Sequence, residues 1–243
     1  MKFPENEIVQ KYYNVYDICN MFNNVAKNYD FINHLSTCGI DKKWRKLTVK
    51  ASGILENKKI IDIATGTADI AIQLARKNPE KVTAVDISEQ MLFYAKKKIE
   101  KHHLNQKIEL IQSDSENLPF HNNTFDVATM GFGIRNCINP VKVLNEINRI
   151  LKPQGKLIIL EFSKPTNKAL NLFIKFYLQN FVSFFGKVLS NNKSAYIYLS
   201  ESINRFPAGN EFLQLMKKAN FDDLSVKKIT SGIVSIYSGK KII

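Results

Sequence analysis

Cysteine and histidine are both scarce in this chain of 243 residues. The three cysteines, Cys19, Cys38 and Cys137, are odd in number and far apart, which argues against a disulfide framework. The four histidines do not have the spacing of a zinc site, and no cluster of cysteines could replace them. The sequence therefore predicts that the protein holds no metal.

Long apolar runs are also lacking. No uninterrupted apolar stretch reaches the length of a membrane span, and the first residues, MKFPENEIVQKYY, lack the apolar region of a secretory signal peptide. Hydrophobic residues nevertheless make up 44% of the chain, which is enough for a substantial core. We therefore expect one cytoplasmic domain over residues 1–243, without an interdomain linker.

Acidic residues are few relative to basic ones, with 22 Asp and Glu against 35 Lys and Arg and a net charge of +13. Such an excess can indicate a nucleic acid or an anionic membrane as partner. The lysines are scattered along the chain in short groups such as Lys96-Lys97-Lys98 and Lys240-Lys241. We therefore expect no nucleic-acid partner, and favour peripheral contact with a membrane surface.

The chain is organised around residues 58–88. Their pattern predicts a buried strand at Ile60–Ala64, a tight turn, a helix at Ala68–Arg76 and a second strand at Lys81–Ile87. In such a βαβ unit, the turn presents free backbone N–H groups beside the end of the second strand. Ligands of nucleoside type bind in that crevice, although a strand-turn-helix without a ligand is the alternative.

Glycine is sparse where a dinucleotide-binding motif would need it. The three glycine positions of that motif read Gly66, Ala68 and Ala71 here, which argues against a bound pyrophosphate. Asp86 follows Gly66 by twenty positions and ends the second strand, where a carboxylate can accept hydrogen bonds from a ribose. S-adenosylmethionine has a ribose but no pyrophosphate, so the pattern favours this cofactor.

Other polar residues are expected around the same crevice. Asp62 and Asp69 flank the turn and could contact the ammonium group of the cofactor, directly or through water. Asp114 follows the predicted third strand, Lys107–Gln112, where it either reaches the adenine amino group or is a turn residue. Ser115, the next residue, can meet a ring nitrogen.

The end of the fourth strand, Thr124–Met130, is the expected meeting place of substrate and cofactor, because strands one and four flank the topological switch point. Two glycines in the following residues 131–136 allow close approach of a ligand. Arg135 in this loop is either a catalytic or positioning cation or an ordinary ion-pair partner.

The remaining segments are expected to surround this core. Residues 1–57 predict a helical cap with amphipathic helices in 5–27, a break at Tyr29–Asn33 and a helix from Lys42 to about Ala51. The cap either folds over the mouth of the crevice or faces solvent. Within the core of residues 58–165, we expect a helix at Pro140–Leu151.

After that helix, a stop at residues 152–155 and a fifth strand at Lys156–Phe162 are expected. Residues 166–205 are interpreted as an inserted aromatic lid, and the alternatives are a membrane contact or a helix packed into the core. Residues 206–243 predict a final helix at Glu211–Ala219 and an antiparallel hairpin of strands 226–229 and 234–237 at the sheet edge.

With these residues in place, the chain resembles the UbiE/MenG family of quinone C-methyltransferases over nearly its full length. The most specific motifs are Phe132-Gly133-Ile134-Arg135-Asn136 and Leu160-Glu161-Phe162-Ser163-Lys164-Pro165. The resemblance implies an α/β, Rossmann-like class I methyltransferase fold with a seven-stranded, mostly parallel sheet. It also implies that S-adenosylmethionine is contacted by Gly66, Thr67, Asp86, Asp114 and Ser115.

The same resemblance implies methylation of a prenylated quinol, with demethylmenaquinol favoured and a ubiquinone precursor as the alternative. Arg135 would stabilise the developing phenolate, and Asn136 and Tyr29 would position the substrate. A nucleic-acid methyltransferase and a binding module without catalysis are less favoured. The expected location is cytoplasmic and peripheral to the inner membrane, and a homodimer stays open.

Three positions depart from the pattern of some family members. Gly131 stands where some have serine, Asp41 where some have histidine, and Gln154 where a second glycine is usual. A contact of the serine hydroxyl is therefore absent here. The substitution at Asp41 leaves open whether a side chain there contributes to the chemistry.

Overall fold

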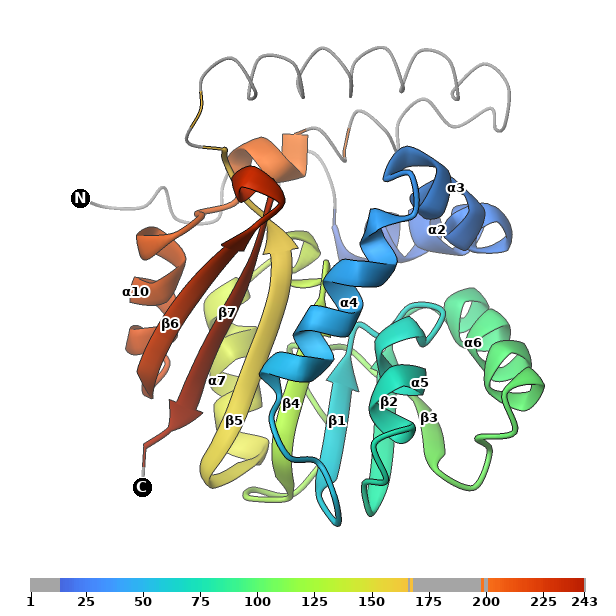
Figure 1. The fold of residues 1–243 in the computed structure, drawn as a ribbon, viewed down its shortest axis with the longest axis horizontal. Coiled ribbons are helices and arrows are strands. Elements are labelled where there is room, and N and C mark those ends of the chain that lie inside the picture. The colour runs from blue at the N-terminus through green and yellow to red at the C-terminus, as the bar shows by residue number, and fades with distance from the viewer. Residues whose placement is uncertain (1–13, 166, 168–197, 199–200, 243) are drawn as a thin grey trace.

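The computed structural model describes residues 14–165, 167, 198 and 201–242. Its centre is a seven-stranded sheet in the order β3-β2-β1-β4-β5-β7-β6, in which β7 runs antiparallel to both of its neighbours (Figure 1). The strands are β1 Lys59–Ile63, β2 Lys81–Asp86, β3 Ile108–Gln112, β4 Phe125–Gly131, β5 Leu151–Phe162, β6 Phe221–Ile229 and β7 Val234–Lys241. The predicted seven-stranded, mostly parallel sheet is confirmed.

Helices cover both faces of this sheet (Figure 1). They are α2 Val15–Val25, α3 Tyr29–Ser36, α4 Ile40–Ala51, α5 Asp69–Ala75, α6 Glu89–Lys101, α7 Pro140–Ile150 and α10 Asn210–Lys218. Short 3-10 turns lie at Ala26–Asn28, Ile134–Asn136 and Thr230–Gly232. β1 and β4 are direct neighbours, and the strand order changes direction between them. The topological switch point therefore lies between strands one and four, as predicted.

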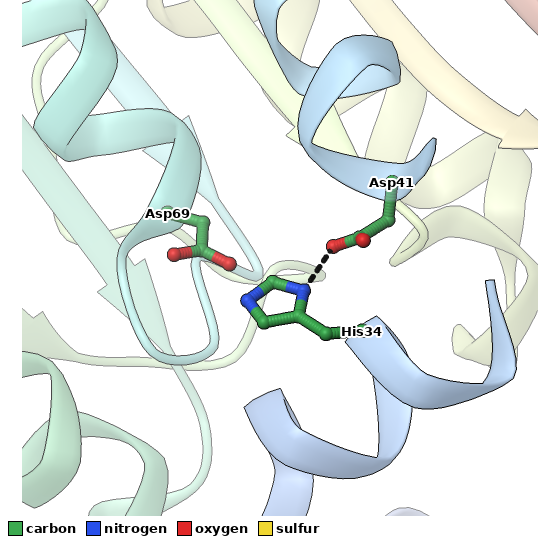
Figure 2. Close-up of side chains that lie close together, drawn as sticks. All are labelled: His34, Asp41 and Asp69. Carbon is green, nitrogen blue, oxygen red and sulfur yellow. Dashed lines mark hydrogen bonds and ion pairs between the residues drawn. The ribbon is translucent and has the colours of Figure 1, made fainter. Parts of the chain in front are cut away.

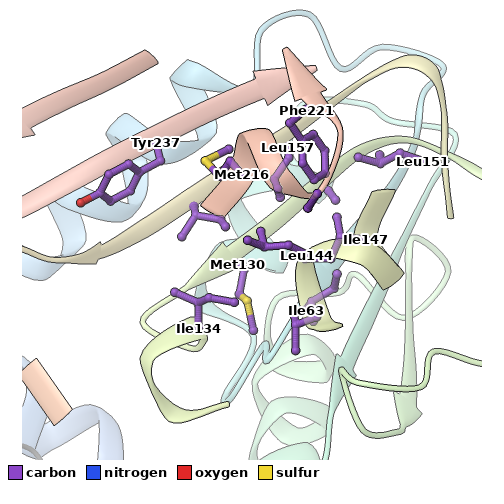
Figure 3. Packing of buried hydrophobic residues seen from close by; sticks show 14 of the residues in the cluster. Ile63, Met130, Ile134, Leu144, Ile147, Leu151, Leu157, Met216, Phe221 and Tyr237 are labelled. Atoms are coloured by element: carbon purple, nitrogen blue, oxygen red, sulfur yellow. The ribbon is translucent and has the colours of Figure 1, made fainter. Parts of the chain in front are cut away.

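Three hydrophobic clusters hold the layers together in the described part of the chain, and the smallest packs Trp44 of α4 against β5 and β7. On one face α5 and α6 pack against the sheet, with Ile60 and Leu74 among the fully buried residues. On the other face α7 and α10 do so through a larger cluster that includes Ile147, Met216 and Tyr237 (Figure 3). Apolar residues at successive positions of β1 point to opposite faces and are all buried, as in a strand covered on both sides.

Side-chain caps fix several helix starts. The Ser88 hydroxyl accepts the N–H of Met91 at the start of α6. Asn139 caps α7 in the same way, and Pro140 occupies its first turn. At the start of α2, Asn14 and Asp17 form a reciprocal capping box.

The expected break at Tyr29–Asn33 is wrong, because these residues begin α3. Asn and Asp favour turns in isolation, but Asp30 is held here by the Thr67 hydroxyl and by Lys98 of α6. These contacts join residues far apart in the sequence, so tertiary structure outweighs the local preference. The helix at 42–51 also begins two residues earlier than predicted, at Ile40.

Strand ends near the sheet edge differ as well. β5 starts at Leu151 rather than Lys156, because residues 151–155 continue the ladder with β4 across a bulge. β6 and β7 form the predicted antiparallel edge hairpin, but both are longer than predicted. Residues 5–13 lie outside the described part of the chain, as does the predicted lid of residues 166–205 apart from residues 167, 198 and 201–205.

Candidate functional site

A pocket opens at the carboxyl ends of β1, β2 and β4 and contains about 790 Å³ of space, part of it open to solvent. Most of its surface is apolar. Its wall comes from the β1 and β2 ends, from the loop after β3, from the loop after β4 and from α2: Val15, Ile18, Phe22, Tyr29, Ile63, Ala64, Gly66, Val85, Asp86, Ile87, Met91, Ser113, Asp114, Ser115, Glu116, Gly131, Phe132, Gly133, Asn136, Cys137 and Ile138.

Asp86 is the buried carboxylate of this pocket. Its Oδ2 accepts the backbone N–H of Gly66 at 2.7 Å, and its Oδ1 accepts that of Ser88 at 2.9 Å. Burial raises the pKa of Asp86 above its usual value, although the N–H groups of Ser88 and Gly66 oppose this shift. The residue therefore both faces the pocket and fixes the loop after β1.

Several residues in and near that loop have positive φ values, although not all of them are glycines. Gly66 has a φ of 56°, and a Cβ there would lie 3.9 Å from the ring of Tyr29. Ala64 and Phe132, which line the pocket without being glycine, also have positive φ values of 51° and 57°. Strained backbone of this kind gathers at ligand sites. Ala68, at the second glycine position of the dinucleotide motif, has a φ of 67° and precedes α5.

Asp114 and Ser115 lie in the pocket wall where the sequence predicted them. Asp114 accepts the N–H of Glu116 through Oδ1 at 2.9 Å. The Ser115 hydroxyl lies 3.6 Å from the sulfur of Cys137. Burial raises the pKa of that thiol to about 12, so Cys137 is an uncharged, apolar part of the wall.

The N-terminal helices form one side of the pocket. Val15, Ile18 and Phe22 of α2 line it, together with Tyr29 at the start of α3. At the rim, Asn23 Oδ1 accepts the Ser88 hydroxyl at 2.6 Å, which ties α2 to the start of α6. The cap therefore covers the crevice rather than only facing solvent.

Thr67 in the first loop, Asp62 at the end of β1 and Asp69 at the start of α5 are not among the residues that line the pocket. The Thr67 hydroxyl donates to Asp30 at 2.6 Å and accepts from Lys98 at 3.1 Å, so it joins the cap to α6. Asp62 accepts the hydroxyls of Thr65 and Thr129, each at 2.6 Å, beneath the turn. Burial raises the pKa of Asp62 to about 6.

Asp69 belongs to a charged cluster between the cap and α5. The His34 Nδ1 atom lies 2.7 Å from Asp41, and its ring points toward Asp69 (Figure 2). Arg45 pairs with both carboxylates, and Lys98 donates to Asp69 at 2.7 Å. Burial alone would raise the pKa of Asp69, but Lys98 and Arg45 outweigh it and hold the pKa below the usual value.

The geometry of this cluster resembles a set of metal ligands, since atoms of His34, Asp41 and Asp69 lie within 4.8 Å of one another. Arg45 and Lys98 already supply the positive charge that a metal would bring. The cluster therefore serves to attach the cap. The sequence left the role of the side chain at position 41 open, and in the structure Asp41 pairs with His34 and Arg45.

Arg135 follows the loop after β4 but does not itself line the pocket. Its Nη1 donates to Glu161 at 2.8 Å and to the carbonyl of Phe132 at 2.7 Å. The side chain of Glu161 is fully buried, and that of Arg135 is 7% exposed. Burial raises the pKa of Glu161, and the guanidinium opposes that shift. In the described part of the chain, the buried Nε of Arg135 has no hydrogen-bond partner.

Comparison with known proteins decides the family. The profile described as "ubiE/COQ5 methyltransferase family" matches residues 9–241. The chain belongs to this family. This methyltransferase is 41% identical over 227 residues to "Ubiquinone/menaquinone biosynthesis C-methyltransferase UbiE" of Rickettsia bellii (strain OSU 85-389), with 91% of each chain covered. It is 39% identical over 224 residues to the mitochondrial "2-methoxy-6-polyprenyl-1,4-benzoquinol methylase" of Caenorhabditis elegans, covering 91% of this chain and 78% of the relative.

Solved structures share the fold of this methyltransferase. The "SAM-dependent methyltransferase, possible histamine N-methyltransferase" of Thermotoga maritima aligns with a TM-score of 0.66 and 22% identity, covering 92% of this chain and 99% of the other. A putative S-adenosyl-L-methionine-dependent methyltransferase of Methanococcus maripaludis aligns with a TM-score of 0.64 and 22% identity, covering 92% and 94%. The predicted class I methyltransferase fold is confirmed.

The pocket residues fit the cofactor of this family. A carboxylate has about four lone-pair positions, and two backbone N–H groups occupy two of them on Asp86, so acceptors remain for the hydroxyls of a ribose. Asp114 keeps its Oδ2 for an amino group, and the apolar Ile87 and Met91 suit a flat base. S-adenosylmethionine is therefore the cofactor of the methyltransferase, as the sequence predicted.

Several pocket residues were not predicted. The periodicity of α2 marked Val15, Ile18 and Phe22 as its apolar face, but a pattern does not show what that face covers. Cys137 and Ile138 follow the Phe132–Asn136 motif directly, and that adjacency was a usable signal. Of the residues predicted to contact the cofactor, Gly66, Asp86, Asp114 and Ser115 meet at the pocket. Thr67, Asp62 and Asp69 are not among its lining residues and bond to other side chains instead.

Proposed function

We propose that this methyltransferase transfers the methyl group of S-adenosylmethionine to a ring carbon of a prenylated quinol, with demethylmenaquinol as substrate and menaquinol as product. The observation that carries the proposal is the match over 91% of the chain to a C-methyltransferase named for ubiquinone and menaquinone biosynthesis. The apolar wall formed by Phe132, Cys137 and Ile138 suits an aromatic ring. The same proposal places the protein in the cytoplasm, at the surface of the inner membrane.

The bound cofactor supplies an electrophilic methyl group, and the protein has to orient a nucleophilic carbon toward it. The ring carbon next to a phenol becomes nucleophilic as the phenol loses its proton. A wall that holds the two reactants in line can account for much of the acceleration. Gly131 and Gly133 let this wall pack closely against its own neighbours, because a Cβ would lie 2.4 Å from Ile70 at Gly131 and 2.6 Å from Ala64 at Gly133.

We assign the stabilisation of the developing phenolate to Arg135. Its Nη1 is occupied by Glu161 and Phe132, but its Nε–H has no partner in the part of the chain that the structure describes. Because the side chain does not line the pocket, the contact would run through a bridging water. Asn136 and Tyr29 do line it and are assigned to positioning.

A second candidate substrate is a polyprenyl benzoquinol, the ubiquinone precursor. The name of the Caenorhabditis elegans relative favours it, and that relative matches nearly as much of the chain. Purified protein offered each quinol in turn with S-adenosylmethionine separates the two. Methylation of the naphthoquinol alone supports demethylmenaquinol, whereas methylation of the benzoquinol alone transfers the assignment to the ubiquinone precursor.

Extraction of quinones from cells that lack the protein tests the substrate class. We expect a demethylated quinone to accumulate and to disappear when the gene is returned, but not when it carries Asp86→Ala. Normal quinones together with undermethylated RNA would overturn the proposal in favour of a nucleic-acid methyltransferase.

A further inference from the structure

The outer side of α3 and the start of α4 expose large apolar side chains to solvent. Phe31 is 58% exposed, and Leu35 and Ile40 are each 42% exposed. Phe31 and Leu35 are four residues apart, so they lie on one face of α3. We call the surface formed by Phe31, Leu35, Ile40 and the adjacent lysines, Lys27, Lys42 and Lys43, the docking face.

The segment that carries this apolar face also carries an excess of exposed positive charge. Residues 26–51 include five exposed lysines, Lys27, Lys42, Lys43, Lys46 and Lys50. The two carboxylates of the same segment are both paired: the partly exposed Asp30 with Lys98, and the buried Asp41 with Arg45. The outer surface of the segment therefore carries lysines and no unpaired carboxylate.

The docking face lies at the mouth of the cofactor pocket. α3 and the start of α4 are at the end of the molecule toward which the parallel strands point (Figure 1). Tyr29, in the first turn of α3, lines the pocket, whereas Phe31 and Leu35 of the same helix are exposed. If a surface binds at the docking face, only α3 therefore separates it from the pocket, and a molecule released from that surface has a short path to the pocket.

We propose that the docking face binds an anionic lipid surface. Exposed apolar side chains that enter the interface, together with lysines and without unpaired carboxylates, are the combination that anchors a helix on such a membrane. The proposal deepens the function given above, on which it rests for its purpose, because a prenylated quinol resides in lipid. Binding to lipid does not itself require that the protein methylates a quinol.

Sedimentation of the full-length protein with lipid vesicles tests the proposal. We expect binding to vesicles of phosphatidylcholine mixed with phosphatidylglycerol, and much weaker binding to pure phosphatidylcholine. Phe31→Ser with Leu35→Ser should lower the partition coefficient about tenfold, because two apolar side chains leave the interface. Lys42→Gln with Lys43→Gln should lower it about fivefold for each lysine, and added salt should reduce this difference.

Matched controls lie at the opposite end of the sheet. Ile54, which is 85% exposed, precedes β1, and Lys217 and Lys218 end α10 before the start of β6. Ile54→Ser and Lys217→Gln with Lys218→Gln should leave vesicle binding unchanged. Calorimetric titration with S-adenosylmethionine should give the same affinity for every variant, which shows that the docking variants are folded.

Two results would overturn the proposal. One is equal loss of vesicle binding in the docking-face and control variants, which would indicate only a general effect of charge and apolar surface. The other is a dimer in sedimentation analysis that Phe31→Ser with Leu35→Ser dissociates while vesicle binding persists, because a second copy would then occupy the face. Vesicle binding through the docking face without quinol methylation would leave this proposal intact and contradict the proposed function.

Discussion

Asp86 and Gly66 are joined by a hydrogen bond of 2.7 Å between the carboxylate and the backbone nitrogen, so the acid that faces the pocket also holds the loop that forms its floor. The contact connects the end of β2 with the turn after β1, twenty residues apart in the sequence. Loss of this side chain therefore removes a ligand contact and loosens the loop at once.

Asp86→Ala should weaken S-adenosylmethionine binding at least about a hundredfold, because each hydrogen bond to a charged acceptor contributes about 1.5–3 kcal/mol. Isothermal titration calorimetry measures the change. Asp126→Ala is the control, because Asp126 also accepts a backbone N–H, from Lys59, at the opposite end of the sheet. Equal affinities of Asp86→Ala and the parent protein would contradict the assignment of this pocket to the cofactor.

Arg135→Ala should lower the free energy of unfolding by about 3–5 kcal/mol, because it leaves the buried Glu161 without its cation. Arg135→Ala combined with Glu161→Gln should recover most of this loss. The fluorescence of Trp44, the single and buried tryptophan, reports unfolding in urea.

The same pair of variants separates structure from catalysis. If Arg135 stabilises the phenolate, the stable double variant still turns over slowly while it binds the cofactor normally. Glu161→Gln alone is the control, because it retains the guanidinium. Full turnover in the double variant would remove Arg135 from the chemistry and leave it as an ion-pair partner.

Asp62 should make the protein less stable as the pH rises from about 4 to 6. Burial raises its pKa in the folded protein from 3.8 to about 6. In this window the unfolded chain has lost the proton and the folded protein has kept it, so the free energy of unfolding falls by about 3 kcal/mol. Asp62→Asn removes this part of the slope, and urea unfolding at several pH values measures the difference.

Asp126 provides the control of opposite sign for that series. Burial would raise its pKa, but the Lys59 N–H and Lys152 outweigh burial and lower it. Asp126→Asn should therefore lose stability relative to the parent as the pH rises through the acidic range. Parallel stability curves for Asp62→Asn and the parent would show that Asp62 is ionised in the folded state.

Gly131→Ser should destabilise the protein by about 1–3 kcal/mol through crowding. A Cβ at Gly131 would lie 2.4 Å from Cδ1 of Ile70, which is buried in α5. Ile70→Val removes that carbon, so the double variant should be more stable than the sum of the single effects predicts. Ile72→Val, a buried change on the same helix, should give no rescue in the same unfolding assay.

The parts of the fold that could be predicted are those coded by contiguous residues. The β1-α5-β2 unit follows from the buried run at Ile60, the helical spacing after it and the strand that ends at Asp86. The start of α6 follows from Ser88, because a helix cap depends on neighbours three residues away, and the start of α7 follows from Pro140, which favours a first helical turn.

The parts that could not be predicted depend on partners distant in the sequence. Tyr29–Ser36 is helical because Asp30 meets Thr67 and Lys98. The sequence offered Arg135 both as a catalytic cation and as an ion-pair partner, and only the fold brings Glu161 to it from 26 residues away. The position of α2 over the crevice was likewise one of two alternatives that periodicity could not separate.

The wall that α2 contributes has a consequence for synthesis on the ribosome. Val15 and Phe22 leave the exit tunnel early, yet the pocket that they line is completed by Gly133 and Ile138, which are translated more than a hundred residues later. The nascent N-terminus therefore has to wait, with its apolar side uncovered, until the fourth strand and the loop beyond it have emerged. A chain arrested before that loop should be a substrate for trigger-factor-like chaperones, and one arrested after it should not.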